Sequence, residues 1–361
     1  MTTEHTRRWR SALRLLGWVE RRAGVPVAST RNRYRIDGQS AVRSDVTVEQ
    51  LRRPISRMAL RVADDAPERK ARCSADVVRL GKFDVDDVVR FRAFHVTSSG
   101  PRSSLRVQGA AGDGSAGVER DLAARRHLQV YAPELAPQLF DHGSDRRRRV
   151  AYLRESVIKG NHPKSAEHFQ QLLPGILTGM LRLYRGVGVD RQRITDVVGD
   201  RFAERWSEVT ASGLVPTHVG SAVDALLARD ADVEVSLGHG DLVRTNVLRA
   251  KGDKLRARGD AVLVDWEYAR SMPIAFDLAK PVLLSADRVV AVEQVRSCLG
   301  DLLGAARSSY RLEEQLALGL AQILSWSSSR AARAAAAGRS EHFERDTSAR
   351  IALLEELLEI R

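Results

Sequence analysis

Three side chains in the C-terminal half of the chain are of types that can carry out acid–base and metal chemistry. The segment Leu237–Glu267 contains Asp241, then Asn246 five residues later, then Asp265. An aspartate can accept the proton of an attacking hydroxyl, and asparagine and aspartate oxygens are hard ligands of the kind that Mg²⁺ prefers. This order indicates metal-assisted phosphoryl transfer, with Asp241 as the base and with Asn246 and Asp265 on the metal.

A predicted hairpin connects these residues. Residues 247–250 and 261–264 are short apolar runs, and the polar stretch between them contains two glycines, which permit the positive φ angles of a turn. Two antiparallel strands are therefore expected here. Such a hairpin would fold Asp265 back beside Asn246.

Each of the three residues also has an ordinary structural interpretation. Asp241 could cap a loop, and Asn246 could satisfy a turn. Asp265 is the least ambiguous, because an acid placed directly after an apolar strand is costly to bury without a partner such as a cation. The shared order and spacing favour the chemical interpretation for all three.

The same segment resembles a known family. His239–Asp241, followed by the asparagine and by Asp265–Glu267, is similar to the HGD and DWE motifs of the aminoglycoside phosphotransferase and choline kinase family. Asp277–Ala279 is similar to the DLA that follows them in that family. The resemblance implies an ATP- and Mg²⁺-dependent kinase of small-molecule hydroxyls. It also implies an α+β, protein-kinase-like fold of two lobes, with a small antiparallel sheet and one main helix in the first and mostly helices in the second.

The resemblance implies roles for neighbouring residues. His239 belongs to the catalytic segment with Asp241, as a histidine that braces the loop rather than one that transfers a proton. Asp277 is expected to hold the same loop by hydrogen bonds. Glu267 would aid a metal or a substrate amine, with an exposed surface acid as the alternative, and Trp266 is expected in the core.

Upstream of the motif the pattern predicts five strands and one helix. The expected strands are 75–80, 88–96, 104–108, 135–140 and 150–158, and the expected helix is 118–131. In the resembling family, backbone groups after the last of these strands hold adenine. That implies Ser156 and Val157 as the adenine contacts.

The first lobe departs from the family at its nucleotide site. The family places a lysine in the third strand, paired with a glutamate of the following helix, whereas this chain has Arg106 there and Glu119 as the expected partner. Arginine differs from lysine in size, shape and hydration. The glycine-rich stretch 111–117 follows the third strand instead of joining the first two. The alternative is a kinase-shaped pseudoenzyme that binds a nucleotide or a partner without transferring phosphate.

These patterns divide the chain into three parts. Residues 1–72 form an N-terminal helical extension without assigned chemistry, 73–157 the first lobe, and 158–361 a helical lobe with the catalytic and metal loops. Helices are expected at 166–185, with a kink or break at Pro174, and at 194–209, 221–228, 289–303, 312–327 and 342–360.

Composition limits the classes of partner. The 361 residues include 58 Lys and Arg against 46 Asp and Glu, a net charge of +12, and only two cysteines. The cysteines exclude a disulfide framework, and the absence of a long apolar run favours a cytoplasmic protein without membrane spans. Scattered arginines, including the run 146–149, are typical of a solvated surface. The hypothesis that the protein binds nucleic acid therefore rests on its net charge alone. Because the net charge of the chain is positive, an anionic or neutral acceptor is as compatible with the sequence as a cationic one.

Overall fold

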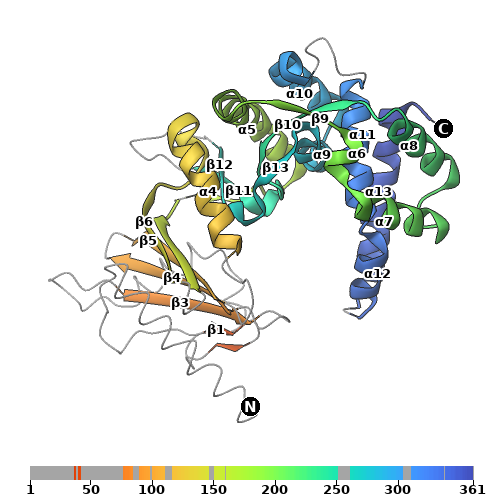
Figure 1. The fold of residues 1–361 in the computed structure, drawn as a ribbon. Coiled ribbons are helices and arrows are strands. Elements are labelled where there is room, and N and C mark those ends of the chain that lie inside the picture. Colours follow the sequence, from red (N-terminus) through yellow and green to blue (C-terminus); the bar gives the residue numbers. More distant parts are fainter. Residues whose placement is uncertain are drawn as a thin grey trace. The chain divides into compact units, whose positions relative to one another are not determined.

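The computed structural model divides into two compact units (Figure 1). The first unit, called the sheet unit, comprises residues 1–129, 136–161 and 248–268. The second unit, called the helical unit, comprises residues 130–135, 162–247 and 269–361. The residues that the structure describes are 36–37, 40–41, 76–83, 89–97, 100–109, 116–145, 150–158, 160–250, 261–303, 310–336 and 338–360.

The sheet unit is built on one five-stranded antiparallel sheet, of order β3-β4-β5-β7-β6. Its strands are β3 (Asp76–Phe83), β4 (Val89–Thr97), β5 (Gly100–Gly109), β6 (Leu139–Asp145) and β7 (Val150–Ser156). Helix α4 (Ala116–Tyr131) follows β5. Five strands and one helix were predicted in this order, and they are confirmed.

Strand β6 lies later in the chain than predicted. Residues 135–140 were expected to form it, but the 3-10 turn η2 (Pro133–Leu135) occupies the start of that range and the strand runs from Leu139 to Asp145. Proline 137 lacks an N–H for the ladder, which disfavours a strand that passes through it. Residues 141–145, which were not assigned to a strand, therefore belong to β6, and 146–149 lies outside the described residues.

A small apolar core joins α4 to the sheet. Val118 and Leu122 of α4 and Ala151 and Leu153 of β7 are buried together, with Leu139 packed against them. Burial of a side chain such as Leu153 contributes roughly 1.5–3 kcal/mol. In the register of the sheet, Arg106 of β5 is opposite Leu153 of β7, so the core fixes the strand that carries Arg106.

The sheet unit also contains the predicted hairpin. Strands β11 (Val247–Ala250) and β12 (Ala261–Leu263) are neighbours in a three-stranded sheet with β8 (Gly160–Asn161). The hairpin is confirmed. Its turn, 251–260, lies outside the described residues.

The helical unit contains nine described helices and one small sheet. The helices are α5 (Ala166–Val187), α6 (Ile194–Val198), α7 (Asp200–Ala211), α8 (Thr217–Ala228), α9 (Ile274–Leu284), α10 (Arg288–Leu303), α11 (Leu312–Leu324), α12 (Ser327–Ala336) and α13 (Ser340–Leu358). The sheet has the order β13-β10-β9, with β9 (Asp190–Arg193), β10 (Asp232–Gly238) and β13 (Arg270–Pro273). The α+β class is confirmed.

Two helices of the helical unit differ from the predictions, and at Pro174 only the break is excluded, so the kink stays a prediction. The helix predicted at 194–209 is two helices, because Gly199 lies between α6 and α7 with a φ of 66°. The helix predicted at 312–327 ends at Leu324, and α12 begins three residues later. Helix α5 continues through Pro174 without a break, and Thr178 Oγ1 donates a hydrogen bond of 2.8 Å to the carbonyl of Pro174.

Little of the predicted N-terminal extension is described. Within residues 1–72 the structure describes two short paired strands, β1 (Ile36–Asp37) and β2 (Ser40–Ala41). The rest of that range, and most of the glycine-rich stretch 111–117, lie outside the described residues. In the described part of the chain, no helix is both long and apolar enough to span a lipid bilayer.

Candidate active site

The loop that carries the predicted catalytic residue Asp241 follows strand β10 of the helical unit. The strand ends at Gly238, Gly240 has a φ of 79°, and the 3-10 turn η3 (Arg244–Asn246) completes the loop. Val243 N donates to the carbonyl of Asp241 at 3.0 Å, and Asn246 N donates to the carbonyl of Val243 at 2.9 Å. These local bonds bring Asn246 back to Asp241.

Asp277 holds the start of this loop, as predicted. Its Oδ2 accepts from the backbone N of His239 at 2.6 Å and its Oδ1 accepts from Gly240 N at 2.9 Å. The carboxylate is buried and lies in the first turn of α9, where the helix dipole favours a negative charge. Charge-assisted bonds to backbone N–H groups are about twice as strong as neutral ones. The loop is thus fixed where the strand ends.

His239 is completely buried and supports the same loop. Its Nδ1 accepts a hydrogen bond of 3.3 Å from the backbone N of Asp241. In a neutral ring this places the proton on Nε2. A ring buried in this way orients the backbone of Asp241, which agrees with the bracing role predicted for it.

Both carboxylate oxygens of Asp241 have partners. Oδ1 lies 2.6 Å from Nζ of Lys280, and Oδ2 accepts from Asn246 Nδ2 at 3.1 Å. The same Nδ2 donates to the carbonyl of Asp241 at 2.9 Å. Asn246 thereby uses its NH₂ within the loop, and its Oδ1 is the atom suited to a metal ion. About one third of the Asp241 side chain is exposed (33%), so a solute can reach it.

Sequence reasoning missed Lys280. A signal was present, because Lys280 follows Asp277 by three residues on α9, and residues at this spacing share a helix face. The helix that supplies the carboxylate for the loop backbone therefore also supplies an ammonium group for the carboxylate of Asp241.

Asp265 stands directly after β12 in the sheet unit and has an unusual backbone. Its φ is 69°, a left-handed conformation that side chains other than glycine rarely adopt. Its Oδ1 lies 2.9 Å from a guanidinium nitrogen of Arg106, and 38% of its side chain is exposed. Strain of this kind costs of order 1–3 kcal/mol and persists where the surroundings fix it.

Arg106 is a buried cation shared by three carboxylates. Besides Asp265, it lies 2.7 Å from Asp121 and 3.3 Å from Glu267. Burial opposes its charge, but the three acids and Glu155 more than compensate and raise the pKa of Arg106 above its ordinary value. The guanidinium is therefore permanently charged.

The partner predicted for Arg106 was wrong. Glu119 is exposed, and Asp121 is the buried residue of α4 that binds Arg106. Two residues correspond to about 200° around a helix, so these two acids lie on opposite faces. Asp121 shares its face with Arg125, four residues later, to which it is also bound at 2.9 Å. That i,i+4 acid–base pair was the available signal.

The acidic cluster extends behind Arg106. Arg125 joins Asp121 to Glu155 of β7, at 2.6 Å, and donates to the carbonyl of Pro137 at 2.7 Å. Ser104 Oγ donates to the other oxygen of Glu155 at 3.4 Å. We call the set Arg106, Asp121, Arg125, Glu155, Asp265 and Glu267 the Arg106 cluster.

Glu267 and Trp266 have the environments of interior residues. Only 5% of Glu267 is exposed and it contacts Arg106, so the alternative of a surface acid was wrong. Arg120 Nε donates to the carbonyl of Glu267 at 2.7 Å. Trp266 is fully buried and its Nε1 donates to the carbonyl of Leu263, which confirms its predicted core position.

The predicted adenine contacts lie at the end of β7. The backbone N of Ser156 donates to the carbonyl of Gln138 at 2.8 Å, and its Oγ accepts from Gln138 N at 2.9 Å. The N–H of Ser156 is therefore engaged with the carbonyl of Gln138. Ser156 and Val157 stay predicted adenine contacts.

Metal-binding groups are few in the described residues. No set of three or more His, Cys, Asp or Glu side chains lies together in a way that could hold a metal ion. Mg²⁺ differs from structural zinc because it is commonly held by one or two protein groups together with substrate phosphates. The amide oxygen of Asn246 in the helical unit and the carboxylate of Asp265 in the sheet unit are each of the hard-donor type that Mg²⁺ prefers.

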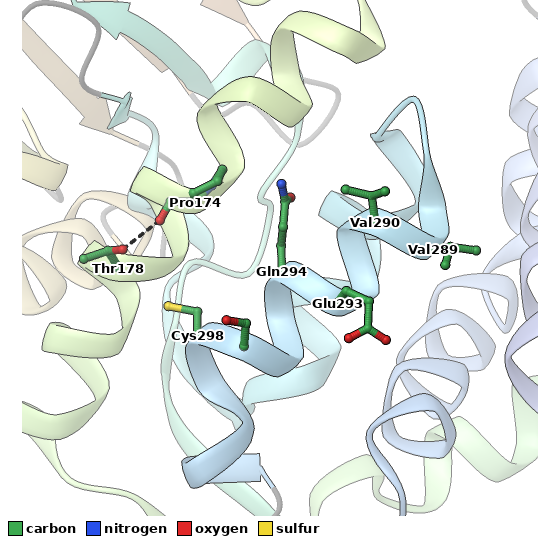
Figure 2. A pocket seen from close by; sticks show the side chains of 8 residues that line it. Pro174, Thr178, Val289, Val290, Glu293, Gln294 and Cys298 are labelled. Atoms are coloured by element: carbon green, nitrogen blue, oxygen red, sulfur yellow. Dashed lines mark hydrogen bonds between the residues drawn. The ribbon is translucent and has the colours of Figure 1, made fainter.

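A groove in the helical unit lies outside this constellation. Figure 2 shows it between α5 and α10, and its volume is about 390 Å³. Its lining residues are Pro174, Thr178, Val289, Val290, Glu293, Gln294, Ser297 and Cys298. Burial raises the pKa of the Cys298 thiol, which makes it a poor nucleophile. None of the predicted site residues lines this groove.

No protein-family model and no curated protein matches the chain. Among solved structures, a thermostable mutant of aminoglycoside phosphotransferase APH(4)-Ia in its apo form matches with 16% identity and a TM-score of 0.48, over 78% of this chain and 95% of that chain. The microcompartment-associated aminopropanol kinase matches with 12% identity and a TM-score of 0.47, over 75% and 90%. A choline/ethanolamine kinase family protein from Mesorhizobium loti matches with 18% identity and a TM-score of 0.43, over 78% and 92%. Identities and scores this low do not define an activity, so the function of this protein must be inferred from its own residues.

Proposed function

We propose that the protein is an ATP-dependent phosphotransferase that acts on a hydroxyl group of a small molecule. The observation that carries this proposal is the arrangement at Asp241. Its carboxylate is partly exposed, both oxygens are oriented by Lys280 and Asn246, and the backbone beneath it is fixed by His239 and Asp277. A pre-oriented, solvent-accessible carboxylate is what a hydroxyl acceptor requires.

Asp241 would orient the acceptor hydroxyl and accept its proton as the oxygen attacks the γ-phosphorus of ATP. The bond between that oxygen and phosphorus forms, the bond from phosphorus to the bridging oxygen breaks, and ADP leaves with the electron pair. Orientation contributes more than base strength in such a loose transition state. The contact with Lys280, which orients the Asp241 carboxylate, is therefore compatible with this role.

Asn246 and Asp265 are the residues that would hold Mg²⁺. When bound, this ion offsets the negative charge of the nucleotide phosphates. Asp265 keeps 38% of its side chain exposed while it contacts Arg106, so its carboxylate remains accessible to a cation from solution.

A second candidate is a pseudoenzyme, and one contact favours it. Arg106 binds Asp265 at 2.9 Å, so it engages the very carboxylate assigned to the metal. A buried arginine with three acidic partners is also less free than a lysine to reach phosphates. In this alternative the protein binds a nucleotide, or a partner, without transferring phosphate.

Replacement of Asp241 by Asn tests the proposed mechanism. We expect the variant to keep binding ATP and Mg²⁺, measured as a thermal shift, and to lose about 10²–10⁴-fold in ADP release with an accepted substrate. Asp287→Asn is the matched control, since this residue caps the start of α10 by accepting from Val290 N. Full turnover by Asp241→Asn would contradict the mechanism. ATP binding by the wild type without transfer to any hydroxyl would favour the pseudoenzyme.

A further inference from the structure

Arg125 of α4 is a buried arginine with no assigned role in the proposed function. Only 1% of its side chain is exposed, and each of its three guanidinium nitrogens donates to a different acceptor. Nε donates to Asp121 at 2.9 Å, Nη1 to the carbonyl of Pro137 at 2.7 Å, and Nη2 to Glu155 at 2.6 Å. Because three acceptors engage one planar group, the guanidinium of Arg125 is fixed in its plane and position.

Asp121 joins Arg125 to Arg106. Its Oδ1 accepts from Arg125 Nε, and its Oδ2 accepts from Arg106 Nη1 at 2.7 Å. One guanidinium would suffice to pair this carboxylate, and the last torsion angle of an aspartate is only loosely restricted by itself. The second guanidinium, on the other oxygen, fixes the rotation of the carboxylate. It thereby also fixes the place at which Arg106 Nη1 is held.

The other end of the Arg106 guanidinium faces the segment after β12. Nη2 lies 2.9 Å from Asp265 and 3.3 Å from Glu267. Arginine has a long side chain with many rotamers, so a fixed direction requires contacts on more than one side of the guanidinium. Asp121 supplies the contact on the side of α4. Arg106 therefore meets Asp265, the predicted metal ligand, in one orientation.

The remaining contacts of Arg125 lie in a part of the sheet unit that is held together without it. Pro137 and Glu155, which accept its hydrogen bonds, each precede a residue of a separate pair of bonds. The N–H of Ser156 donates to the carbonyl of Gln138 at 2.8 Å, and Gln138 N donates to Ser156 Oγ at 2.9 Å. The end of β7, with the predicted adenine contacts, would therefore keep its place if Arg125 were changed.

We propose that Arg125 is a positioning residue for the binding of nucleotide phosphates and Mg²⁺. Through Asp121 it holds the guanidinium of Arg106 in the orientation that meets Asp265, while its own burial keeps it from touching a ligand. This inference rests on the proposed function, because ATP and Mg²⁺ are the ligands that Arg106 and Asp265 would bind. A change at Arg125 should thus alter binding of the phosphates and the metal and spare the adenine end.

Calorimetry with Arg125→Lys on the full chain tests this inference. Lysine keeps the positive charge, but one ammonium group does not reproduce the three directed bonds of the guanidinium. We expect the Kd of ATP with Mg²⁺, and that of inorganic triphosphate with Mg²⁺, each to rise about ten-fold or more. The Kd of adenosine should stay at the wild-type value. An unchanged Kd for either probe that contains Mg²⁺, or an equal loss for adenosine, would overturn the inference.

Two further variants of α4 separate positioning from stability. Arg126→Lys is the matched control, since Arg126 is the next residue and is exposed, and it should bind all three probes as the wild type does. Leu122→Ala removes a core side chain of the same helix that belongs to no ion pair of the Arg106 cluster. It should lower Tm and leave all three Kd values unchanged at a temperature where it is folded. If Leu122→Ala weakens the binding of ATP with Mg²⁺ as much as Arg125→Lys does, the loss reflects stability and the inference is rejected.

A double-mutant cycle tests the path through Asp121. If Arg125 acts through this carboxylate, Arg125→Lys should weaken the binding of ATP with Mg²⁺ much less in an Asp121→Asn background than in the wild type. Additive changes in log Kd would overturn the path.

Glu155→Gln replaces the cycle if one of its variants does not fold. This substitution weakens the anchoring of Arg125 from the side of β7 and keeps Asp121. We expect weaker binding of ATP with Mg²⁺ and unchanged binding of adenosine. No loss, or an equal loss for both, would again contradict the positioning role.

Failure of the proposed function would be recognised separately. The Kd values report binding alone, so a protein that binds ATP and Mg²⁺ without transferring phosphate would give the same pattern, and the Asp241→Asn comparison decides transfer. Wild-type protein that binds neither ATP nor triphosphate in the presence of Mg²⁺ would reject both the phosphotransferase and the role of Arg125.

Discussion

The two units each hold an aspartate of the candidate site against a basic side chain, but in different ways. In the sheet unit, Arg106 is buried and is shared among Asp265 and two further acids. In the helical unit, Lys280 is partly exposed and, among the residues that the structure describes, pairs with Asp241. The buried ion pairs fix the positions of the side chains around Arg106, and removing Arg106 takes a partner from each of the acids bound to it. The exposed pair contributes little to folding and can respond to a solute.

Removing the buried cation should have the largest effect. Arg106→Met leaves three carboxylates without their guanidinium, and loss of one partner of a buried ion pair costs roughly 3–5 kcal/mol. We expect a marked decrease in the free energy of unfolding, measured by denaturant titration. Arg106→Lys keeps the charge and should recover part of the stability. A stable Arg106→Met variant would show that the cluster does not fix the unit.

Asp277→Asn weakens the fixed end of the catalytic loop. The substitution keeps the shape but removes the charge that assists the bonds from His239 N and Gly240 N, each worth about 1.5–3 kcal/mol. We expect lower stability and, because Asp241 is less well positioned, a lower kcat. Hydrogen exchange at residues 239–241 should increase. Unchanged exchange there would mean that Asp277 does not hold the loop.

The two acids of α4 provide an internal comparison. Asp121→Asn should lower the unfolding free energy, because Asp121 is completely buried between Arg106 and Arg125. Glu119→Gln, two residues earlier and exposed, should leave it unchanged. Thermal denaturation of both variants measures the difference. Equal destabilisation would contradict the assignment of these two acids to opposite faces of α4.

These acids also show what the sequence can predict. Hydrophobic patterns predicted the five strands, α4 and the main helices, because burial of apolar side chains dominates the choice of elements. The pairing of Asp277 with the loop was predicted from a motif. The choice between Glu119 and Asp121 depends on the rotation of α4 against the sheet, which the weak apolar pattern of that helix does not define. Lys280 was missed because its role arises only when α9 packs behind the loop.

Replacing Lys280 tests the exposed side of the comparison. Lys280→Met should change stability by about 1 kcal/mol or less, as expected for a partly exposed ion pair. Its kinetic effect should be larger, with a lower kcat, because Asp241 loses a contact that positions its carboxylate. A variant as destabilised as Arg106→Met would remove the distinction between the two sites.

Glu234 of β10 is another buried acid, and the ion pair that it forms among the described residues is long. Arg191 Nε is 4.0 Å from Oε1, and 1% of the residue is exposed. Burial raises the pKa of Glu234. Hydrogen bonding and the charge of Arg191 lower this pKa, but by less than burial raises it. A carboxyl group with a raised pKa binds its proton more tightly in the folded state, so this contribution to stability is lost as pH rises through the folded-state pKa.

Glu234→Gln should therefore have the smallest effect and a distinctive pH dependence. The amide has no proton to lose, so the variant should gain in Tm relative to the wild type as pH rises from below the ordinary glutamate pKa to neutrality. Glu344→Gln, on the exposed surface of α13, provides the control. A difference in Tm that does not change with pH would show that burial without a close cation is tolerated in the ionised form. It would also mean that buried acids such as those bound by Arg106 can stay ionised without a close cation. The role of Arg106 in the cluster would then be to orient Asp265.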